Sequence, residues 1–510
     1  MLPAAWVGLA VAALPAFRPL SEDALYRTEL RFARGVPRLS LGLAEERPSV
    51  ELRSDALGRV FFEQDGLPRA VLVPSGATVR VEPRRLVPGR RAWWATAPVL
   101  EGVPPPRPNP RRVRTGGLFA VGEAVVDTRR EVWRAGPFDS AEAATEAAPG
   151  AAPMATVLRR PRGVLTVRVD GEVIGRAEGP VALQPAPGAA WRFDDRSVDA
   201  PLYALPGMSA GLDLVASLDA ETLLRGLVPA ETFASAPPAA LEAQAVVARS
   251  AMLSMLGHRH FDAPFHLCAR QHCQVYAGAQ TAQPSTDAAV AATRGRVVVG
   301  GTGDLVETVY SASCGGHTEA NEVVWARQAS PYLRPRLDGS SADPALAPFA
   351  DGIHAGNVDA WVEVAPPTYC ARASLTRPER FRWTRVLDRA ALDALGERLG
   401  LGGITALRVL GRGRGGRVTG VALEGPGGRR EVLRELPVRR LLGGLRSGAF
   451  VVRPQRGPDG ALEQVELLGG GFGHGVGLCQ MGAIGRAEAG QTATEILEFY
   501  YSGARVVRLY

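Results

Sequence analysis

The sequence of 510 residues predicts an α+β fold, in which a β-rich N-terminal region precedes a larger domain of mixed strands and a few helices. Residues 25–100 contain several runs of alternating apolar and polar side chains with Gly or Pro between them, a pattern typical of half-buried strands. Residues 237–256 instead repeat apolar side chains at three- and four-residue steps and carry Pro in the first turn, which indicates a helix. A chain of this length has enough residues for two to four domains.

The first residues of the chain have the composition of an export signal. Residues 1–17 are mostly apolar or small, and the run is too short to span a bilayer comfortably. Small residues near Ala13 and Ala16 offer cleavage points. We therefore expect a signal peptide over 1–17 and an exported protein of the periplasm, cell envelope or medium, with no later transmembrane segment. No Arg or Lys precedes the apolar run, so a misplaced start codon or a buried strand is an alternative.

Composition changes mark the expected boundaries after the β-rich region. Residues 101–115 are rich in Pro and predict a linker. Residues 116–150 predict a strand, a Gly-Pro turn and an Ala- and Glu-rich helix, which resembles half of a SPOR repeat, the module that binds peptide-stripped glycan strands. A plain strand–helix unit is the alternative. Residues 160–510 are expected to form the main domain, with its motifs concentrated in 205–340 and 465–505.

The net charge of +7 comes from arginine, because the chain contains no lysine. A GC-rich codon usage explains this composition, and selection for bidentate recognition of carboxylate or phosphate is the alternative. The arginines are spread thinly and lack the aromatic interleaving of nucleic-acid binders, so we expect no nucleic-acid partner. An anionic polymer is compatible with this charge but is not identified by it.

Glu231 is the candidate acid/base residue. It follows Pro229 in a short apolar turn, and the helix of residues 237–256 begins shortly afterwards. Apolar neighbours such as Leu227 and Phe233 would favour the protonated carboxyl that a general acid needs. The alternative is a charge that complements the N-terminal dipole of the helix.

Four metal-ligand side chains follow the helix within eight residues: His266, Cys268, His272 and Cys273. Two nitrogens and two sulfurs suit tetrahedral Zn²⁺, so a structural zinc site is one interpretation. A Cys268–Cys273 disulfide or unlinked side chains are the others. The chain has five cysteines, and an odd number in an exported protein leaves at least one free thiol or metal ligand. Cys314 and Cys370 are candidates for a second disulfide.

Two glycine-containing segments lie further along the chain. Residues 310–325 read YSASCGGHTEANEVVW, and residues 469–483 read GGGFGHGVGLCQMGA. In the first, Gly315 and Gly316 permit close approach of the backbone to a ligand, although a polar hairpin turn fits equally. The second lacks the Gly-Lys-Ser/Thr of a phosphate-binding loop, so glycines around His474 indicate tight packing against a substrate or another loop.

Taken in order, these motifs resemble the stage II sporulation protein D (SpoIID/LytB) family over about 300 residues. The matching segments are Val228–Glu231, Ala240–Ser250, Cys273–Gly278, Ser311–Trp325, Tyr332-Leu333 with Asp338, and Gly473–Gly503. The resemblance implies a SpoIID-type catalytic domain and lytic transglycosylase activity on peptidoglycan. Such an enzyme cuts between N-acetylmuramic acid and N-acetylglucosamine, prefers peptide-stripped strands and leaves 1,6-anhydro ends.

The resemblance also implies the site residues. Glu231 corresponds to the single acid/base, which makes a second carboxylate unnecessary. Motif membership makes the following residues candidates for substrate contact: Gln244, Arg249, Tyr276, Ser313, Gly315, Gly316, Thr318, Glu319, His474 and Gln480. Some family members bind zinc through a His/Cys cluster after the helix, and no organic cofactor is implied.

The same family contains amidase enhancers, which act by binding a cell-wall amidase. A non-catalytic amidase enhancer is therefore the second hypothesis, and a glycan-binding wall protein without turnover is the third. Glu231 within its motif favours the enzyme. The setting is either sporulation or general wall remodelling.

Overall fold

The structure is a computed structural model that describes residues 17–26, 30–99, 110–115, 118–121, 124–127, 130–147, 152–260, 262–325 and 327–510. Within these residues it confirms the α+β class and the β-rich N-terminal region. Residues 1–16 of the expected signal peptide and 101–109 of the expected linker lie outside the described part. None of the helices in the described part is long and apolar enough to cross a membrane.

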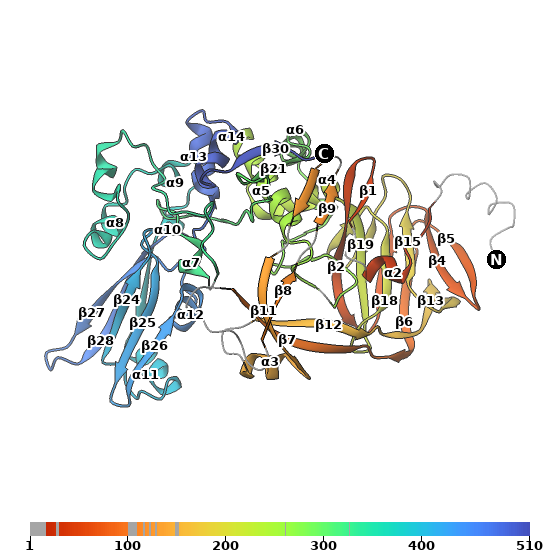
Figure 1. Cartoon of the computed structure of the whole chain (residues 1–510), viewed down its shortest axis with the longest axis horizontal. Helices are drawn as coiled ribbons and strands as arrows, with labels where there is room; N and C mark the ends of the chain where they lie inside the picture. The colour runs from red at the N-terminus through yellow and green to blue at the C-terminus, as the bar shows by residue number, and fades with distance from the viewer. Residues whose placement is uncertain are drawn as a thin grey trace. The chain divides into compact units, whose positions relative to one another are not determined.

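The chain divides into two compact units, whose segments can be followed by colour in Figure 1. The first unit comprises Met1–Glu231, Met252–Gly295 and Leu509–Tyr510, and the second comprises Thr232–Ala251 and Arg296–Arg508. The residues expected to form one domain over 160–510 are thus shared between both units. Most of helix α5 (Pro238–Ser254) belongs to the second unit. The reason is that Ser250 and Val247 of this helix are hydrogen bonded to Val298 and Thr308 of the same unit.

The first unit contains an eight-stranded sheet that is antiparallel apart from β20. Its strands in spatial order are β1 (Arg31–Ala33), β2 (Val36–Arg47), β19 (Leu212–Asp219), β18 (Leu202–Pro206), β15 (Val181–Pro185), β4 (Gly58–Gln64) and β5 (Leu67–Val73), with β20 (Leu267–Cys268) parallel to β2. Burial alternates along β4, as its sequence predicts, whereas β19 is buried on both faces.

Two further sheets and a hairpin complete the β structure described for the first unit. One has the order β14 (Glu172–Ala177), β13 (Arg162–Val169), β6 (Thr78–Val87), β3 (Val50–Ser54), β16 (Trp191–Phe193) and β17 (Arg196–Val198). The other has the order β12 (Ala152–Arg159), β7 (Arg90–Pro98), β11 (Arg130–Phe138) and β8 (Arg111–Thr115), and β9 (Leu118–Val121) pairs with β10 (Ala124–Asp127).

The sequence predicts a Gly-Pro turn within residues 131–148, and this prediction is wrong. Gly136 and Pro137 lie inside β11, at a shift in the pairing of β11 with β7 between Ala135 and Phe138. The pairing of β11 with both β7 and β8 holds this segment extended, and the irregularity absorbs the proline, which cannot donate to the ladder. The helix expected after the turn is confirmed as α3 (Ala141–Ala147), where Ala143 N–H donates to Ser140 Oγ.

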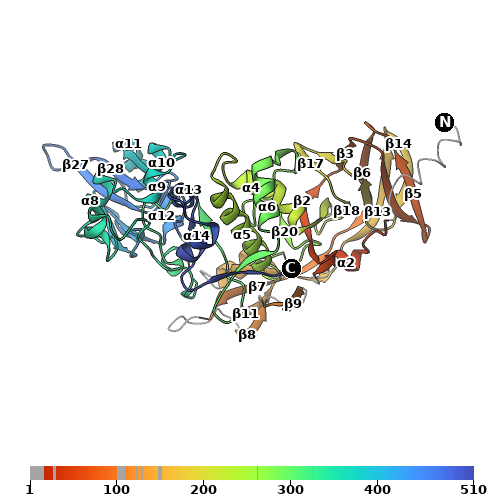
Figure 2. The ribbon, with the colours of Figure 1, turned by 90° about the horizontal axis from the view of Figure 1, so that it is seen from above.

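The other helices described for the first unit are α2 (Glu22–Tyr26), α4 (Ala220–Glu231), η1 (Ala279–Thr281) and α6 (Pro284–Ala292). Helix α4 packs against α6, η1 and β2, and Figure 2 shows α4 and α6 next to each other. A core cluster of Leu25, Tyr203, Val215 and Phe265 joins α2, β18 and β19 to the loop before β20. This packing places the loop against the large sheet.

The second unit contains two three-stranded sheets, with the orders β23 (Arg382–Leu387), β28 (Leu462–Gly470), β27 (Phe450–Arg456) and β24 (Ala406–Arg412), β25 (Val418–Gly425), β26 (Gly428–Leu433). Helix α11 (Arg389–Arg398) packs against β23 and β28, and α12 (Glu435–Leu441) packs against β25 and β26. Leu392, Val421 and Phe450 belong to one fully buried core that these elements share.

The remaining elements of the second unit carry its sequence motifs. They are β21 (Arg296–Val299) paired with β30 (Arg505–Arg508), β22 (Tyr310–Ser311) paired with β29 (Leu478–Cys479), and the helices α7 (Asn321–Val324), η2 (Pro344–Phe349), α8 (Val358–Val364), α9 (Tyr369–Arg372), α10 (Pro378–Phe381), α13 (Gln480–Glu488) and α14 (Ala493–Tyr500). The β22–β29 pair brings the 310–319 segment beside the glycine-rich loop of residues 469–479.

Candidate active site

Glu231 is the last residue of α4, rather than part of a separate turn before α5 as its sequence suggested. Pro229 is accommodated inside the final turn, where a missing N–H removes one helical hydrogen bond without preventing the helix from reaching Glu231. The carboxyl is half-buried and lies at the C-terminal end of a helix, where the macrodipole does not favour a negative charge. The dipole of α4 therefore does not stabilise a negative charge on Glu231.

Helix α4 is fixed at its start and along its length. Asp219 Oδ1 accepts hydrogen bonds from the N–H groups of Glu221 and Thr222 at 3.1 and 3.0 Å, as an N-cap does. Arg225 in the middle of the helix binds the carboxylate of Asp287 on α6 through two nitrogens, at 2.9 and 2.7 Å. These contacts fix the position of helix α4 and therefore the position of Glu231 at its end.

The segment from Val275 to Ala277 holds the last two turns of α4. Val275 N–H donates to Glu231 Oε1 at 3.1 Å, and Ala277 N–H donates to the carbonyl of Gly226 at 3.2 Å. The buried ring of Tyr276 lies against Gly226, where a Cβ atom would come within 2.4 Å of the ring. Gly226 is therefore required for this close approach, and one carboxylate oxygen is oriented by a backbone donor.

A His/Cys cluster stands directly before this segment, but its membership differs from the expected one. The ligand atoms of His260, Cys268, His272 and Cys273 all lie within 4.8 Å of one another. His260 Nε2 is 3.3 Å from Cys273 Sγ, and His272 Nδ1 is 3.7 Å from both sulfurs. His260 thus occupies the place that the sequence analysis assigned to His266.

His266 is directed elsewhere by strand pairing. Leu267 and Cys268 pair with Leu41 and Gly42 of β2, which holds the neighbouring ring of His266 against Ser40. Its Nδ1 accepts from Ser40 N–H at 3.0 Å and lies 2.7 Å from Ser40 Oγ. Burial lowers the pKa of His266 to about 4, so the ring is neutral at pH 7.

The only signal for His260 in the sequence is its residue type, because histidine is a metal ligand and this one lies a few positions before Cys268. Its backbone adopts φ 54°, in the left-handed region that few residues other than glycine occupy. No periodic pattern indicates such a turn. Local chain geometry therefore decides which histidine reaches the two cysteines.

The cluster is chemically suited to zinc. Tetrahedral zinc with Zn–S and Zn–N bonds of about 2.3 and 2.0 Å separates a sulfur from a nitrogen ligand by about 3.5 Å. The distances of 3.3 to 3.7 Å between the His nitrogens and the Cys sulfurs match that separation. The hydrogen bond between the two thiols lowers the pKa of Cys268 and raises that of Cys273, so one proton is shared within the pair.

The 310–319 segment of the second unit is largely buried, including five of the ten residues expected to contact substrate. Ser313, Gly315, Gly316, Thr318 and Glu319 are all buried, and their contacts are internal. A Cβ atom on Gly315 would meet the backbone of residues 470–471 at 2.8 Å, and one on Gly316 would meet the Trp361 ring at 2.6 Å. The two glycines thus permit close packing of buried chain segments, which differs from the polar hairpin turn considered from the sequence.

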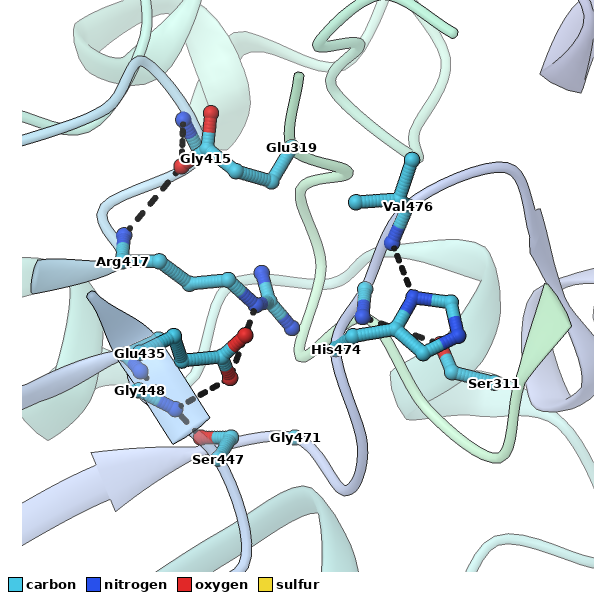
Figure 3. A network of polar contacts seen from close by, with 12 residues as sticks. Ser311, Glu319, Gly415, Arg417, Glu435, Ser447, Gly448, Gly471, His474 and Val476 are labelled. Carbon is cyan, nitrogen blue, oxygen red and sulfur yellow. Dashed lines mark hydrogen bonds and ion pairs between the residues drawn. The ribbon is translucent and has the colours of Figure 1, made fainter. Parts of the chain in front are cut away.

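A fully buried arginine connects this segment to the rest of the second unit, as Figure 3 shows. Arg417 donates to the carbonyls of Cys314 and His317 at 3.3 and 3.4 Å, and its Nε lies 3.8 Å from Glu435 Oε1. Glu319 accepts from the backbone N–H groups of Gly415 and Arg417 at 3.0 and 3.3 Å. Burial raises the pKa of Glu319 and of Glu435, and the Arg417 charge opposes this effect.

His474 locks the glycine-rich loop in a defined conformation. Its Nδ1 accepts from Val476 N–H at 3.1 Å, so Nε2 carries the proton and donates to the Tyr310 carbonyl at 2.8 Å. Desolvation and then the Arg417 charge lower the pKa of His474 to about 3. Both ring nitrogens hold backbone groups, and Figure 3 shows the bond from Val476, while the ring centroid lies 4.9 Å from that of Trp325.

The remaining motif residues of the second unit are Gln244, Arg249 and Gln480. Gln480 is half-buried and donates from Nε2 to Oε1 of the buried Gln244 at 3.3 Å. Arg249 is fully buried and donates to the carbonyl of Arg296 at 3.1 Å. The structure therefore brings Gln244 and Gln480 together, and it uses Arg249 to join α5 to β21.

These features define a class: an α+β protein in which a carboxylate at a helix end is held by a segment that follows a His/Cys cluster. Residues 208–299 match the family model described as Stage II sporulation protein (SpoIID), and residues 319–477 match a domain of unknown function (DUF8618). The first match contains α4, Glu231 and the whole His/Cys cluster. This match and the similarity to proteins named stage II sporulation protein D support the resemblance to the SpoIID family.

Similar proteins carry names from the same family. An uncharacterized protein of Brachyspira hyodysenteriae is 29% identical over 58% of this chain and 68% of its own length. The stage II sporulation protein D of Bacillus amyloliquefaciens is 26% identical over 64% of this chain and 83% of its own length. The amidase enhancer of Bacillus subtilis is 27% identical over 55% of this chain, which spans only 39% of that protein.

Proposed function

We propose that this protein is a peptidoglycan lytic transglycosylase with Glu231 as its acid/base residue. The observation that carries the proposal is the half-buried Glu231 carboxyl, held by Val275 N–H at 3.1 Å within the segment that matches SpoIID. The names of the relatives, stage II sporulation protein D and amidase enhancer, place them in sporulation and cell-wall processes. We infer an exported or envelope protein acting on the cell wall.

The reaction needs one carboxyl group. Protonated Glu231 donates its proton to the oxygen between N-acetylmuramic acid and N-acetylglucosamine while the bond to the anomeric carbon breaks. The carboxylate then removes the proton from the 6-hydroxyl of the muramic acid, whose oxygen attacks the anomeric carbon. The product is a 1,6-anhydro end, no water is consumed, and Glu231 returns to its protonated form.

The zinc that the cluster would bind has a structural role in this proposal. His260, Cys268, His272 and Cys273 would supply all four ligands, which leaves no open position for a substrate or water. Bound zinc would cross-link the loop and thereby fix the backbone of Val275, two residues after Cys273. The residues that then orient Glu231 are Val275 and Tyr276.

Substrate contacts are proposed from motif membership together with exposure. Gln480 and the His474–Trp325 ring pair are half-buried, so they can contact a sugar without rearrangement. Gln244 would position Gln480 through its hydrogen bond. Arg249, Tyr276, Ser313, Gly315, Gly316, Thr318 and Glu319 are buried and would support these surfaces rather than contact the glycan.

A non-catalytic amidase enhancer is the second candidate, favoured by the match to the Bacillus subtilis protein of that name. In that case the chain would bind a cell-wall amidase and raise its release of stem peptides. Glu231 would then serve the local structure of α4 alone.

Digestion of glycan strands, intact and peptide-stripped, separates the candidates. Mass spectrometry of the products should show 1,6-anhydro ends with wild type, and a loss of at least about 100-fold with Glu231→Gln, because general acid/base catalysis contributes about 10²–10⁴-fold. Glu172→Gln, at the exposed start of β14, is the matched control and should retain activity. Absence of anhydro ends with wild type, combined with faster stem-peptide release when an amidase is added, would establish the enhancer instead.

A further inference from the structure

Three cysteines and one aspartate meet in the interior of the second unit, although they are far apart in the sequence. Cys314 follows β22, Asp338 follows the 310–325 segment, Cys370 lies in α9, and Cys479 precedes α13. Their ligand atoms all lie within 4.8 Å of one another, and all four side chains are buried. The disulfide considered for Cys314 and Cys370 is not formed, since their sulfurs are 3.7 Å apart.

The distances in this cluster are those of a tetrahedral metal site. Zinc with Zn–S bonds of about 2.3 Å separates two sulfur ligands by about 3.8 Å, and a sulfur from a carboxylate oxygen by about 3.6 Å. Cys314 Sγ lies 3.7 Å from Cys370 Sγ and 3.6 Å from Asp338 Oδ2. Both separations fit a common central ion.

The backbone around Cys479 stabilises a thiolate rather than a thiol at this position. Cys479 Sγ accepts hydrogen bonds from the backbone N–H groups of Cys314 and Gly482, at 3.1 and 3.2 Å. The second donor belongs to the first turn of α13, whose dipole favours a negative charge at this position. A neutral thiol gains little from two backbone donors, whereas a metal-bound thiolate is stabilised by both.

The carboxylate is oriented as a metal ligand usually is. Asp338 Oδ1 accepts from Tyr500 Oη at 2.9 Å and from Arg486 Nε at 3.1 Å, while Oδ2 faces Cys314. Arg382 donates to the carbonyl of Gly315 and interacts electrostatically with Cys314 and Cys370. Three thiolates and one carboxylate carry four negative charges, which a divalent cation and the two guanidinium groups balance.

We propose that Cys314, Asp338, Cys370 and Cys479 form a second, structural zinc site, separate from the His/Cys cluster of the first unit. With four protein ligands the site is closed, so the metal would not take part in the glycan chemistry. It would join the 310–319 segment to α9 and α13, where secondary structure is short and most hydrogen bonds come from loops. This proposal does not depend on the activity of Glu231.

Metal analysis of the full chain tests the site. We expect about two zinc ions per wild-type chain and about one in each of Cys273→Ser and Cys370→Ser, since each variant removes one ligand of a four-ligand site. The double variant should contain none. An unchanged zinc content in Cys370→Ser would overturn the proposal, as would a Cys314–Cys370 linked peptide in a digest of the non-reduced protein.

A second measurement remains informative if Cys370→Ser does not fold. In Cys273→Ser purified with Co²⁺ in place of zinc, the remaining site should show thiolate-to-cobalt charge-transfer absorption. In the same protein, a chelator should release the metal and make Cys314, Cys370 and Cys479 reactive to alkylation in partly unfolded protein. Absence of the cobalt band in folded Cys273→Ser would also overturn the proposal.

Discussion

Val275 donates its backbone N–H to the carboxylate of Glu231 at 3.1 Å, across a separation of 44 residues in the sequence. Cys273, a member of the His/Cys cluster, lies two residues before Val275. The conformation of the loop that carries the His/Cys cluster therefore affects the orientation of the Glu231 carboxyl. Through Val275, the proposed structural zinc site would influence the orientation of Glu231, the proposed acid/base residue.

Removing the Val275 donor should lower activity. Val275→Pro deletes the N–H, and a hydrogen bond to a charged group contributes about 1.5–3 kcal/mol, so we expect a loss of about 10- to 100-fold in the rate of anhydro-end formation. Val275→Ala keeps the N–H and is the control for the lost side chain. Equal rates for the two variants, at equal thermal stability, would show that the donor does not orient Glu231.

The two candidate histidines should differ in their effect on zinc. His260→Ala removes a ligand and should reduce the zinc content by about one ion per chain. His266→Ala should retain zinc, because its ring binds Ser40 instead. Elemental analysis of both purified variants checks this, and zinc loss in His266→Ala alone would restore the assignment made from the sequence.

Gly475 should be intolerant of a side chain. Its φ is 68°, and a Cβ atom would lie 2.0 Å from Nη2 of Arg417. Gly503 has the same φ but open space around it, so Gly503→Ala measures the cost of the backbone conformation alone. We expect Gly475→Ala to reduce the free energy of unfolding by about 1–3 kcal/mol more than Gly503→Ala in urea titrations. Equal losses would contradict the packing described for the loop.

The Arg417–Glu435 pair should show coupling. Arg417→Met removes the positive charge that acts on the buried carboxylates of Glu319 and Glu435 and leaves Glu435 with Arg439 alone, which should cost about 3–5 kcal/mol of unfolding free energy. Adding Glu435→Gln removes one of these buried charges, so the double variant should be more stable than the sum of the single losses predicts. Urea unfolding of the four proteins in this cycle provides the coupling energy, and additive losses would contradict it.

Asp213 should make stability depend on pH. Burial raises its pKa from 3.8 to about 7, so the folded state binds more protons than the unfolded chain between these values. The contribution of Asp213 to the free energy of unfolding therefore falls as the pH rises through this window, by up to about 1.4 kcal/mol per pH unit.

Asp213→Asn removes this titration and preserves an acceptor for Glu46 N–H, which the aspartate binds at 3.0 Å. The variant should match wild type near pH 4 and exceed it in stability at pH 7.5 by on the order of a few kcal/mol. Unfolding curves at both pH values test this, and a constant difference between the two proteins would refute the role of Asp213.

The sequence by itself determined the features that depend on neighbours along the chain. Alternating polarity predicts β3 and β4, and three- and four-residue spacing predicts α5 almost to its ends. Ordered motifs also identify the family and single out Glu231, Cys268, His272 and Cys273, because each motif is a short contiguous run of residues. These signals are local, since side-chain periodicity follows directly from the geometry of strands and helices.

Only the tertiary structure decided which distant groups meet. The pairing of β20 with β2 turns His266 toward Ser40, and a left-handed residue brings His260 to the cysteines instead. Long-range packing likewise gathers Cys314, Cys370 and Cys479 around Asp338, and buries Arg417 against Glu435. Such contacts leave no periodic pattern in the sequence. They are stabilised by burial and pairing between segments that are far apart along the chain.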